Sequence, residues 1–219
     1  MDDLFLHACC GPCATVAVPA WRAEGLEPRL WFWNPNIQPA VEHERRRQSL
    51  LRFAAAEELA VVGAAPAAAD DAAGCADERA APVRVGFATE AASDGGSAGG
   101  SAWRAWAASL SATPPEARCA ACLRLRMADA AAAAVRAGAA RFSTTLSVSP
   151  YQRHDLIRLA GREAAELQGV EFIYVDLRPR FRESYAESRR LGLYRQVYCG
   201  CAASKWEAWH QRRARRSTR

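Results

Sequence analysis

Short apolar runs alternate with longer amphipathic stretches along this chain. The apolar runs have the length and the branched or aromatic side chains of buried strands, and they cover residues 4–8, 29–33, 59–62, 141–146 and 170–175. The longer stretches are typical of helices and cover residues 14–23, 40–58, 119–136 and 155–167, with a mostly helical region from residue 181 onward. This order predicts an α/β fold with a mainly parallel sheet, flanking helices and a helical C-terminal part.

The end of the first predicted strand is where such a fold is expected to carry its chemistry. In open parallel sheets, ligands bind beyond the carboxyl ends of the strands. The first apolar run is followed at once by Cys9 and by the turn-forming pair Gly11-Pro12. By contrast, the helix predicted at 40–58 carries a charged face that includes Glu42 and Arg46.

Residues 64–113 differ in composition from the rest of the chain. Ala, Asp, Gly and Ser dominate there, and residues 94–100 have the composition of a linker. We therefore expect one catalytic domain over residues 1–219, with a flexible surface insertion at about 64–113 that could serve as a lid. A basic tail follows at 212–219.

Composition excludes several classes of protein. The 219 residues are 50% hydrophobic and 24% charged, which is ordinary for a globular domain with a full core. The chain has no apolar run of membrane-spanning length, and its acidic start, Met1-Asp2-Asp3, is unlike a signal peptide. The net charge is +5, and Lys205 is the only lysine. Arginine suits phosphate binding, although the codon bias of a GC-rich genome gives the same composition.

Eight cysteines carry the strongest chemical signal. Seven of them form three tight clusters, whereas Cys75 stands alone and is expected to be a free thiol without a role. Thiols are kept reduced inside cells, and clustered reduced thiols point to metal binding or redox chemistry. The three clusters are Cys9, Cys10 and Cys13; Cys119 and Cys122; and Cys199 and Cys201.

The first two clusters lie at predicted helix starts, where the helix dipole favours thiolates. The spacing Cys119-Ala120-Ala121-Cys122 places two thiols on one helix face. Such pairs are typical of iron–sulfur or zinc sites. A four-cysteine zinc site stays open as an alternative, although the adjacent Cys9 and Cys10 suit a zinc knuckle poorly.

The Cys199-Gly200-Cys201 segment has a different character. A disulfide across one glycine would be strained and therefore labile, which is typical of a redox-active pair. The same two thiols could instead bind metal or be inert. Among the histidines, His7 is expected to be packed in the first strand, and His43, His154 and His210 to lie at the surface.

Other catalytic signatures are missing from the sequence. It contains no GxSxG, no phosphate-binding GxxxxGK[ST] and no GxGxxG motif. The loop after the first strand reads Cys-Cys-Gly-Pro-Cys rather than Ser-Gly-Gly, so we predict that the protein does not use ATP.

Six segments together give the chain a resemblance to the QueH type of epoxyqueuosine reductase. They occur in the order found in that family, although Gln152 stands where the family usually has lysine. The segments are LHACCGPC at 6–13, WNPNIQP at 33–39, PEARCAACLRLRM at 115–127, FSTTLSVSPYQ at 142–152, VDLRPRF at 175–181 and LYRQVYCGCAAS at 193–204.

The resemblance implies a HUP-like (adenine nucleotide α-hydrolase-like) fold with five parallel strands. It also implies a cytoplasmic enzyme that removes the epoxide oxygen of epoxyqueuosine at the tRNA wobble position, the last step of queuosine synthesis. A [4Fe-4S] cluster would be held by Cys9, Cys10, Cys119 and Cys122. Cys13, with one or both thiols of the Cys-Gly-Cys pair, would be a candidate ligand of a second iron, and Cys199 and Cys201 would be redox-active.

The implied substrate is a tRNA anticodon loop, which suits an arginine-rich surface. Candidate substrate-binding residues are Arg124, Arg126, Tyr151, Arg195 and the tail at 212–219. A basic tail can equally be a solvated end. An electron donor, not identified by the sequence, would also be needed.

Two readings from other classes compete with this one. The first is a zinc-stabilised RNA-binding module without catalysis. The second is a metal-independent thiol–disulfide oxidoreductase that acts through Cys199 and Cys201. Metal content separates them, because only an iron–sulfur enzyme contains iron together with acid-labile sulfide.

Overall fold

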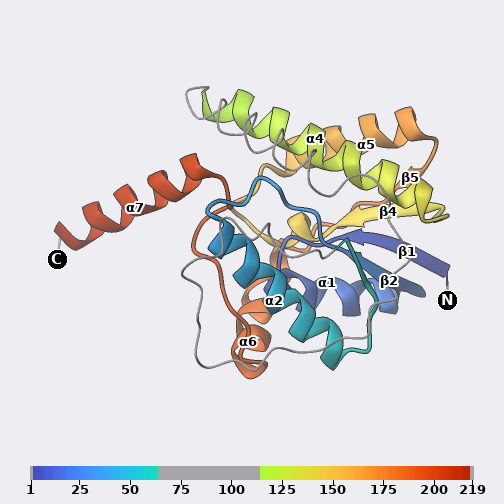
Figure 1. The fold of residues 1–219 in the computed structure, drawn as a ribbon, viewed down its shortest axis with the longest axis horizontal. Helices are drawn as coiled ribbons and strands as arrows, with labels where there is room; N and C mark the ends of the chain where they lie inside the picture. Colours follow the sequence, from blue (N-terminus) through green and yellow to red (C-terminus); the bar gives the residue numbers. More distant parts are fainter. Residues whose placement is uncertain (1, 64–113, 218–219) are drawn as a thin grey trace.

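The fold is that of a computed structural model, which describes residues 2–63 and 114–217 (Figure 1). The insertion predicted at about 64–113, with Cys75, lies outside the described residues. In the described ranges no helix combines the length and the apolar character needed to cross a membrane.

Five parallel strands form one sheet, as the sequence predicts. Their order across the sheet is β3-β2-β1-β4-β5, and every neighbouring pair is parallel. The strands are β1 (Asp2–His7), β2 (Leu26–Trp31), β3 (Val61–Val62), β4 (Arg141–Thr144) and β5 (Glu171–Phe172). The α/β class and the HUP-like arrangement are therefore confirmed.

The helices also follow the predicted pattern. They are α1 (Gly11–Ala23), α2 (Ala40–Ala56), α4 (Pro115–Arg136), α5 (His154–Gln168), α6 (Phe181–Arg190) and α7 (Ala202–Ser217), with 3-10 turns at η3 (Thr145–Val148) and η4 (Arg178–Arg180). The strand predicted at 141–146 stops at Thr144, because the Thr144 hydroxyl accepts a hydrogen bond from the Leu146 amide at 3.2 Å and opens η3.

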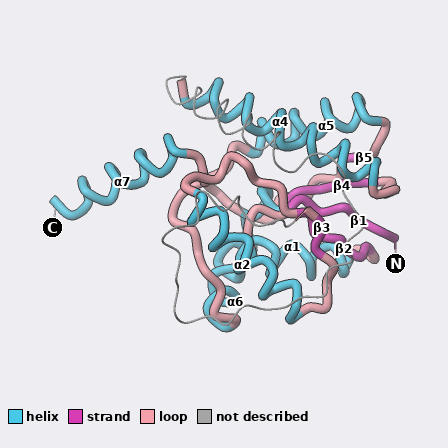
Figure 2. The backbone as a smooth tube through the Cα atoms, in the orientation of Figure 1, coloured by secondary structure: helices cyan, strands magenta, loops and turns pink. Residues whose placement is uncertain are grey.

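The sheet is covered on both faces. Helices α4 and α5 lie on one face, and α1, α2 and α6 lie on the other, while α7 extends away from the body (Figures 1 and 2). Apolar side chains of β1, such as Leu4, Phe5 and Leu6, are fully buried between these layers. This arrangement leaves the carboxyl edge of the sheet for the functional residues.

The register of the central strands brings distant segments together at that edge. His7 is paired with Thr144, so the residues just beyond them, Cys9 and Thr145, become neighbours. The Cys9 amide donates to the Thr145 hydroxyl at 3.2 Å. Helix α4 precedes β4 and runs back across the sheet, so its N-terminal turns, with Cys119 and Cys122, lie toward the same edge.

Candidate metal centre

The first cysteine cluster (Cys9, Cys10 and Cys13) sits on a tight connection between β1 and α1. Cys10 is in extended conformation, and α1 begins at the next residue, Gly11. A Cβ at Gly11 would lie 2.4 Å from the Ser49 carbonyl oxygen, so only glycine allows α2 to approach this closely. The connection therefore gathers three thiols at the N-terminus of a buried helix.

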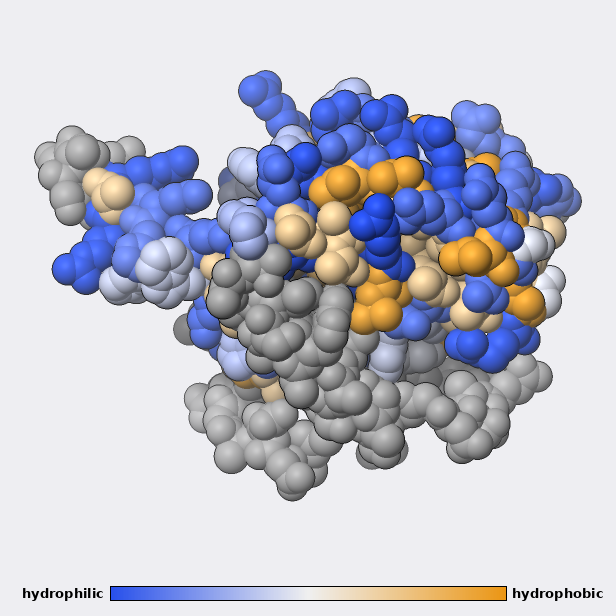
Figure 3. All heavy atoms as spheres, turned by 90° about the horizontal axis from the view of Figure 1, so that it is seen from above, coloured by the Kyte–Doolittle hydropathy of each residue, from blue (hydrophilic) through white to orange (hydrophobic). Residues whose placement is uncertain are grey.

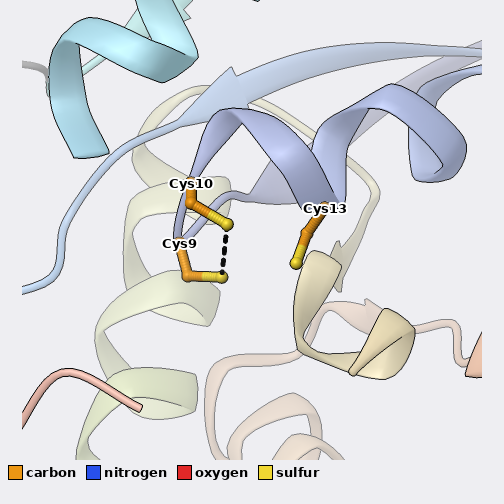
Figure 4. Close-up of side chains that lie close together, drawn as sticks. All are labelled: Cys9, Cys10 and Cys13. Carbon is orange, nitrogen blue, oxygen red and sulfur yellow. Dashed lines mark hydrogen bonds between the residues drawn. The ribbon is translucent and has the colours of Figure 1, made fainter. Parts of the chain in front are cut away.

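The three sulfurs converge (Figure 4). All lie within 4.8 Å of one another, and the Cys9 and Cys10 Sγ atoms are 3.6 Å apart. The side chains of Cys9, Cys10 and Cys13 are buried. A compact set of buried sulfur atoms is the donor set that soft, thiolate-binding metals select.

The three thiols of this cluster share little negative charge, because burial opposes ionisation of each of them. Hydrogen bonds from Cys10 and Cys13 hold the pKa of Cys9 well below its ordinary value, although burial opposes this. Hydrogen bonds with Cys10 and Cys9, together with burial, raise the pKa of Cys13. Buried thiols lose their protons and become thiolate ligands when a metal ion binds, because the positive charge of the ion stabilises the thiolates. The donor set therefore fits a metal site.

The buried side chains of His7 and Arg126 lie next to each other, and both act electrostatically on Cys9. The His7 Nδ1 lies 2.8 Å from the Thr144 hydroxyl, and burial, with the charge of Arg126, lowers the pKa of His7 to about 3. His7 is therefore a neutral packed side chain, as predicted. His154, expected at the surface, is instead buried and lies 2.8 Å from the Ser149 carbonyl.

Arg126 is not on the surface, where its predicted contact with RNA would place it. It is 2% exposed and donates to the Asn34 Oδ1 at 2.7 Å. Its charge favours the thiolate forms of both Cys9 and Cys122. The sequence hid this position because a helix pattern rich in alanine gives little sign of which face is buried.

The other two cysteine clusters lie close to each other. Cys119, Cys122 and Cys201 are half-buried, Cys199 is exposed, and all are free thiols. Burial raises the pKa of Cys122 to about 12; Arg126 opposes this rise, and the nearby Cys199 and Cys201 add to it. Among the described residues, only the first cluster brings three sulfur atoms within 4.8 Å of one another, so Cys119, Cys122, Cys199 and Cys201 do not belong to so compact a group.

The Cys-Gly-Cys loop (residues 191–201) closes over the first cluster. The Gln196 side-chain amide donates to the Cys10 Sγ at 3.0 Å. The Gln38 amide donates to the Gly200 carbonyl at 2.7 Å. Gly200 has a φ of +135°, and a Cβ there would lie 3.0 Å from Ile37, so glycine is required between the two cysteines. The Gln152 side chain donates to the exposed Cys199 Sγ at 3.5 Å.

A buried ion pair on α2 holds this loop. The Arg46 guanidinium donates to the carbonyls of Cys199 at 2.9 Å and Tyr198 at 3.0 Å. It also pairs with Glu42 at 2.7 Å, and the Tyr194 hydroxyl donates to Glu42 at 2.5 Å. The sequence pattern places both residues on a charged face of the helix, although their spacing of four is that of a helix ion pair.

The predicted substrate-binding residues differ in exposure. Arg124 is exposed and pairs with Glu163 at 2.8 Å. Tyr151 is 85% exposed and meets Phe181 edge to face. Arg195 is half-buried, with its guanidinium 3.0 Å from the centre of the Tyr185 ring.

Comparison with known proteins places the chain among its relatives. The family model described as epoxyqueuosine reductase QueH matches residues 4–72 and 96–207. The chain is 28% identical to the epoxyqueuosine reductase QueH of Dehalococcoides mccartyi, over 93% of both chains. It is also 28% identical to that of Thermotoga maritima, over 94% of this chain and 92% of the relative.

Both the first cysteine cluster and the Cys-Gly-Cys loop lie within the matched residues. The parallel sheet and the three gathered thiols are consistent with the family match, which covers most of the sequence. The chain belongs to the QueH family of epoxyqueuosine reductases.

Proposed function

We propose that this protein is an epoxyqueuosine reductase that converts epoxyqueuosine to queuosine at the wobble position of tRNA. The observation that carries the proposal is the buried first cysteine cluster at the carboxyl edge of the sheet, in a chain of the QueH family. The reaction takes two electrons and two protons: the epoxide oxygen leaves as water, and an alkene remains.

The residues proposed to hold a [4Fe-4S] cluster are Cys9, Cys10, Cys119 and Cys122. Cys13 is then left to bind a second iron. When bound, these groups supply single electrons and a Lewis acid for the epoxide oxygen. The chain itself supplies sulfur donors, a neutral His7 and the buried cation of Arg126 beneath them.

Cys199 and Cys201 are proposed to act as a dithiol. Oxidation of the two thiols to one disulfide releases two electrons and two protons, which balances the reduction of one epoxide. An external electron donor then returns the disulfide to the dithiol. The support is geometric: Cys199 is exposed, and the loop that carries both cysteines lies over Cys10.

Arg124, Tyr151 and Arg195 are proposed to contact the RNA. Arg124 and Tyr151 are exposed. Arg195 precedes Gln196, whose side chain contacts Cys10 of the first cysteine cluster. A tRNA substrate also implies that the protein works in the cytoplasm.

Metal analysis tests the proposed ligand set. We expect iron and acid-labile sulfide in anaerobically reconstituted protein, and loss of most of the iron in Cys119→Ala and in Cys122→Ala. Cys75→Ala is the matched control, because Cys75 stands outside the three clusters. Wild-type iron and cluster absorbance in both variants would contradict the assignment. One zinc per chain without sulfide would favour a zinc-stabilised RNA-binding module.

Turnover tests the Cys-Gly-Cys pair. Cys199→Ser and Cys201→Ser are expected to abolish the formation of queuosine in tRNA with dithionite as reductant. Iron counting in the same samples separates two roles: a redox pair leaves all iron in place, whereas a ligand pair loses the second iron and keeps the cluster. Near-normal turnover in both variants would remove the pair from the mechanism.

A further inference from the structure

Helix α7 carries exposed aromatic rings away from the body of the molecule. Trp206 is 64% exposed and Trp209 is 48% exposed. The helix extends into solvent, and its described surface is mostly hydrophilic (Figures 1 and 3). Neither tryptophan belongs to the hydrophobic core that the described residues form, so packing of that core does not explain them.

The rings form one continuous stripe. The spacing of Trp206, Trp209, His210 and Arg213 places them on the same helix face. The Trp206 and His210 ring centres are 3.9 Å apart, and those of Trp209 and His210 are 4.7 Å apart. The Arg213 guanidinium lies 5.3 Å from the Trp209 ring centre. The stripe is therefore a run of three aromatic rings in mutual contact, tilted or edge-on to one another, that ends in a cation.

The charge of the helix is strongly positive. Its basic residues are Lys205, Arg212, Arg213, Arg215 and Arg216, and its only acidic residue is Glu207. Glu207 already pairs with Arg118 at 2.7 Å. The spacing places Lys205 and Arg212 together along one side of the aromatic stripe. The surface is therefore complementary to a polyanion with flat rings.

Two contacts fix the stripe beside the cysteines. The Arg118–Glu207 pair ties α7 to the residue that precedes Cys119. The first turn of α7 is built on Cys201: the Ser204 amide donates to its Sγ at 3.4 Å, and the Lys205 amide donates to its carbonyl at 3.1 Å. The aromatic stripe thus begins a few residues from the Cys-Gly-Cys pair.

We propose that α7 is a stacking platform for unpaired bases of the tRNA anticodon loop, with Trp206 and Trp209 as the platform and the flanking basic side chains along the phosphates. This inference rests on the proposed function and adds the surface that holds its substrate. Aromatic stacking with basic contacts to the backbone is how proteins hold single-stranded nucleic acid.

Other occupants suit this surface less well. A membrane-binding helix buries a continuous apolar face, whereas the stripe of α7 is interrupted by His210 and Arg213, and its other apolar residues are only alanines. A second copy of α7 would bring like charges together. The positive charge and the short stripe of aromatic rings, without a wider apolar face, favour RNA.

The test measures binding of a synthetic anticodon stem–loop to the full-length protein. Trp206→Ala and Trp209→Ala are each expected to weaken binding by roughly 5- to 150-fold, which corresponds to the loss of one stacked base. The slope of affinity against salt concentration should stay unchanged, because no phosphate contact is lost. Trp206→Phe keeps a ring and should retain most of the affinity.

Leu167→Ala is the matched control. Leu167 is 81% exposed at the end of α5, so its removal takes apolar surface from another helix and should leave binding unchanged. Because neither tryptophan belongs to the buried core, their replacement leaves no core cavity, and circular dichroism checks that the helix remains.

The outcomes separate the inference from the proposed function. Wild-type affinity in both alanine variants of an enzyme that still forms queuosine would overturn the inference alone. Tryptophan-dependent RNA binding without any wild-type turnover would contradict the proposed function alone. Tryptophan-dependent binding to phosphatidylglycerol vesicles, or tryptophan-dependent dimerisation, with RNA binding unaffected would also overturn the inference.

Discussion

Arg126 shows how much one buried side chain contributes to the candidate site. It is 2% exposed, and its charge adds to burial in lowering the pKa of the neighbouring His7 and itself lowers the pKa of Cys9. A cation that cannot leave its position favours the more negative state of any centre beside it. Arg126 is thus suited to stabilise thiolates and to make a bound iron centre easier to reduce.

We predict that Arg126→Gln lowers the midpoint potential of the reconstituted protein. Loss of the buried positive charge makes the reduced, more negative state less stable, while glutamine retains a donor toward Asn34. Arg124→Gln is the control, because Arg124 is two residues away and pairs with Glu163 at the surface. The measurement is a spectroscopic redox titration, and equal potentials in both variants and the wild type would refute the prediction.

At the scale of elements, α2 positions the Cys-Gly-Cys loop through Arg46. The Glu42–Arg46 pair is buried, and Arg46 spans the carbonyls of Tyr198 and Cys199. The loop contains no helix or strand, so its geometry depends on contacts with its surroundings, among which those of Arg46 join the two residues that precede Gly200. The helix and the loop therefore behave as one unit.

Arg46→Met should destabilise the protein by about 3–5 kcal/mol, because it leaves Glu42 buried without its partner. The double variant with Glu42→Gln should lose less.

Alkylation of Cys199 should be faster in Arg46→Met, because the loop is released. Urea unfolding and thiol-labelling rates measure both effects. Arg22→Met is the control: it breaks two pairs that are about one-third exposed, each worth at most about 1 kcal/mol, so it should cost less than Arg46→Met. An equal loss in the two variants would contradict this role.

The elements were largely predictable, and the contacts between them were not. Hydrophobic periodicity indicated the order of the described strands and helices but not their bounds: the run predicted at 29–33 is β2 at Leu26–Trp31, and β5 is confined to Glu171–Phe172 within the predicted run 170–175. The helical region predicted from residue 181 onward is two helices, α6 and α7, separated by the Cys-Gly-Cys loop. Cysteine spacing located the candidate site. The burial of Arg46 and Arg126 was missed, because local sequence does not reveal which polar side chains distant segments will cover.

At the scale of the whole molecule, charge governs the encounter with a polyanion. The chain has a net charge of +5, and four of its arginines lie at 212, 213, 215 and 216. Deletion of residues 212–219 should flatten the slope of log binding constant against log salt concentration for tRNA. The slope should fall by about 0.7 per lost single-strand phosphate contact and about 0.9 per lost duplex contact.

Arg141→Gln is the matched control for that deletion, because Arg141 lies at the start of β4, at the opposite edge of the sheet from the cysteines. Filter binding over a range of salt concentrations gives the slopes. If the shortened protein has the same slope as the wild type, the tail makes no phosphate contacts and is only a solvated end.

The hydrogen bond from Gln196 to Cys10 joins residues 186 positions apart. Contacts between such distant parts of a chain form slowly, because a long loop must close first. We expect folding to complete the sheet and the first cysteine cluster before the Cys-Gly-Cys loop covers them. The proposed iron centre would therefore be inserted from that side, and each later opening of the loop would expose it to oxygen. The lifetime of the centre in air should follow the hydrogen-exchange rate of residues 196–201.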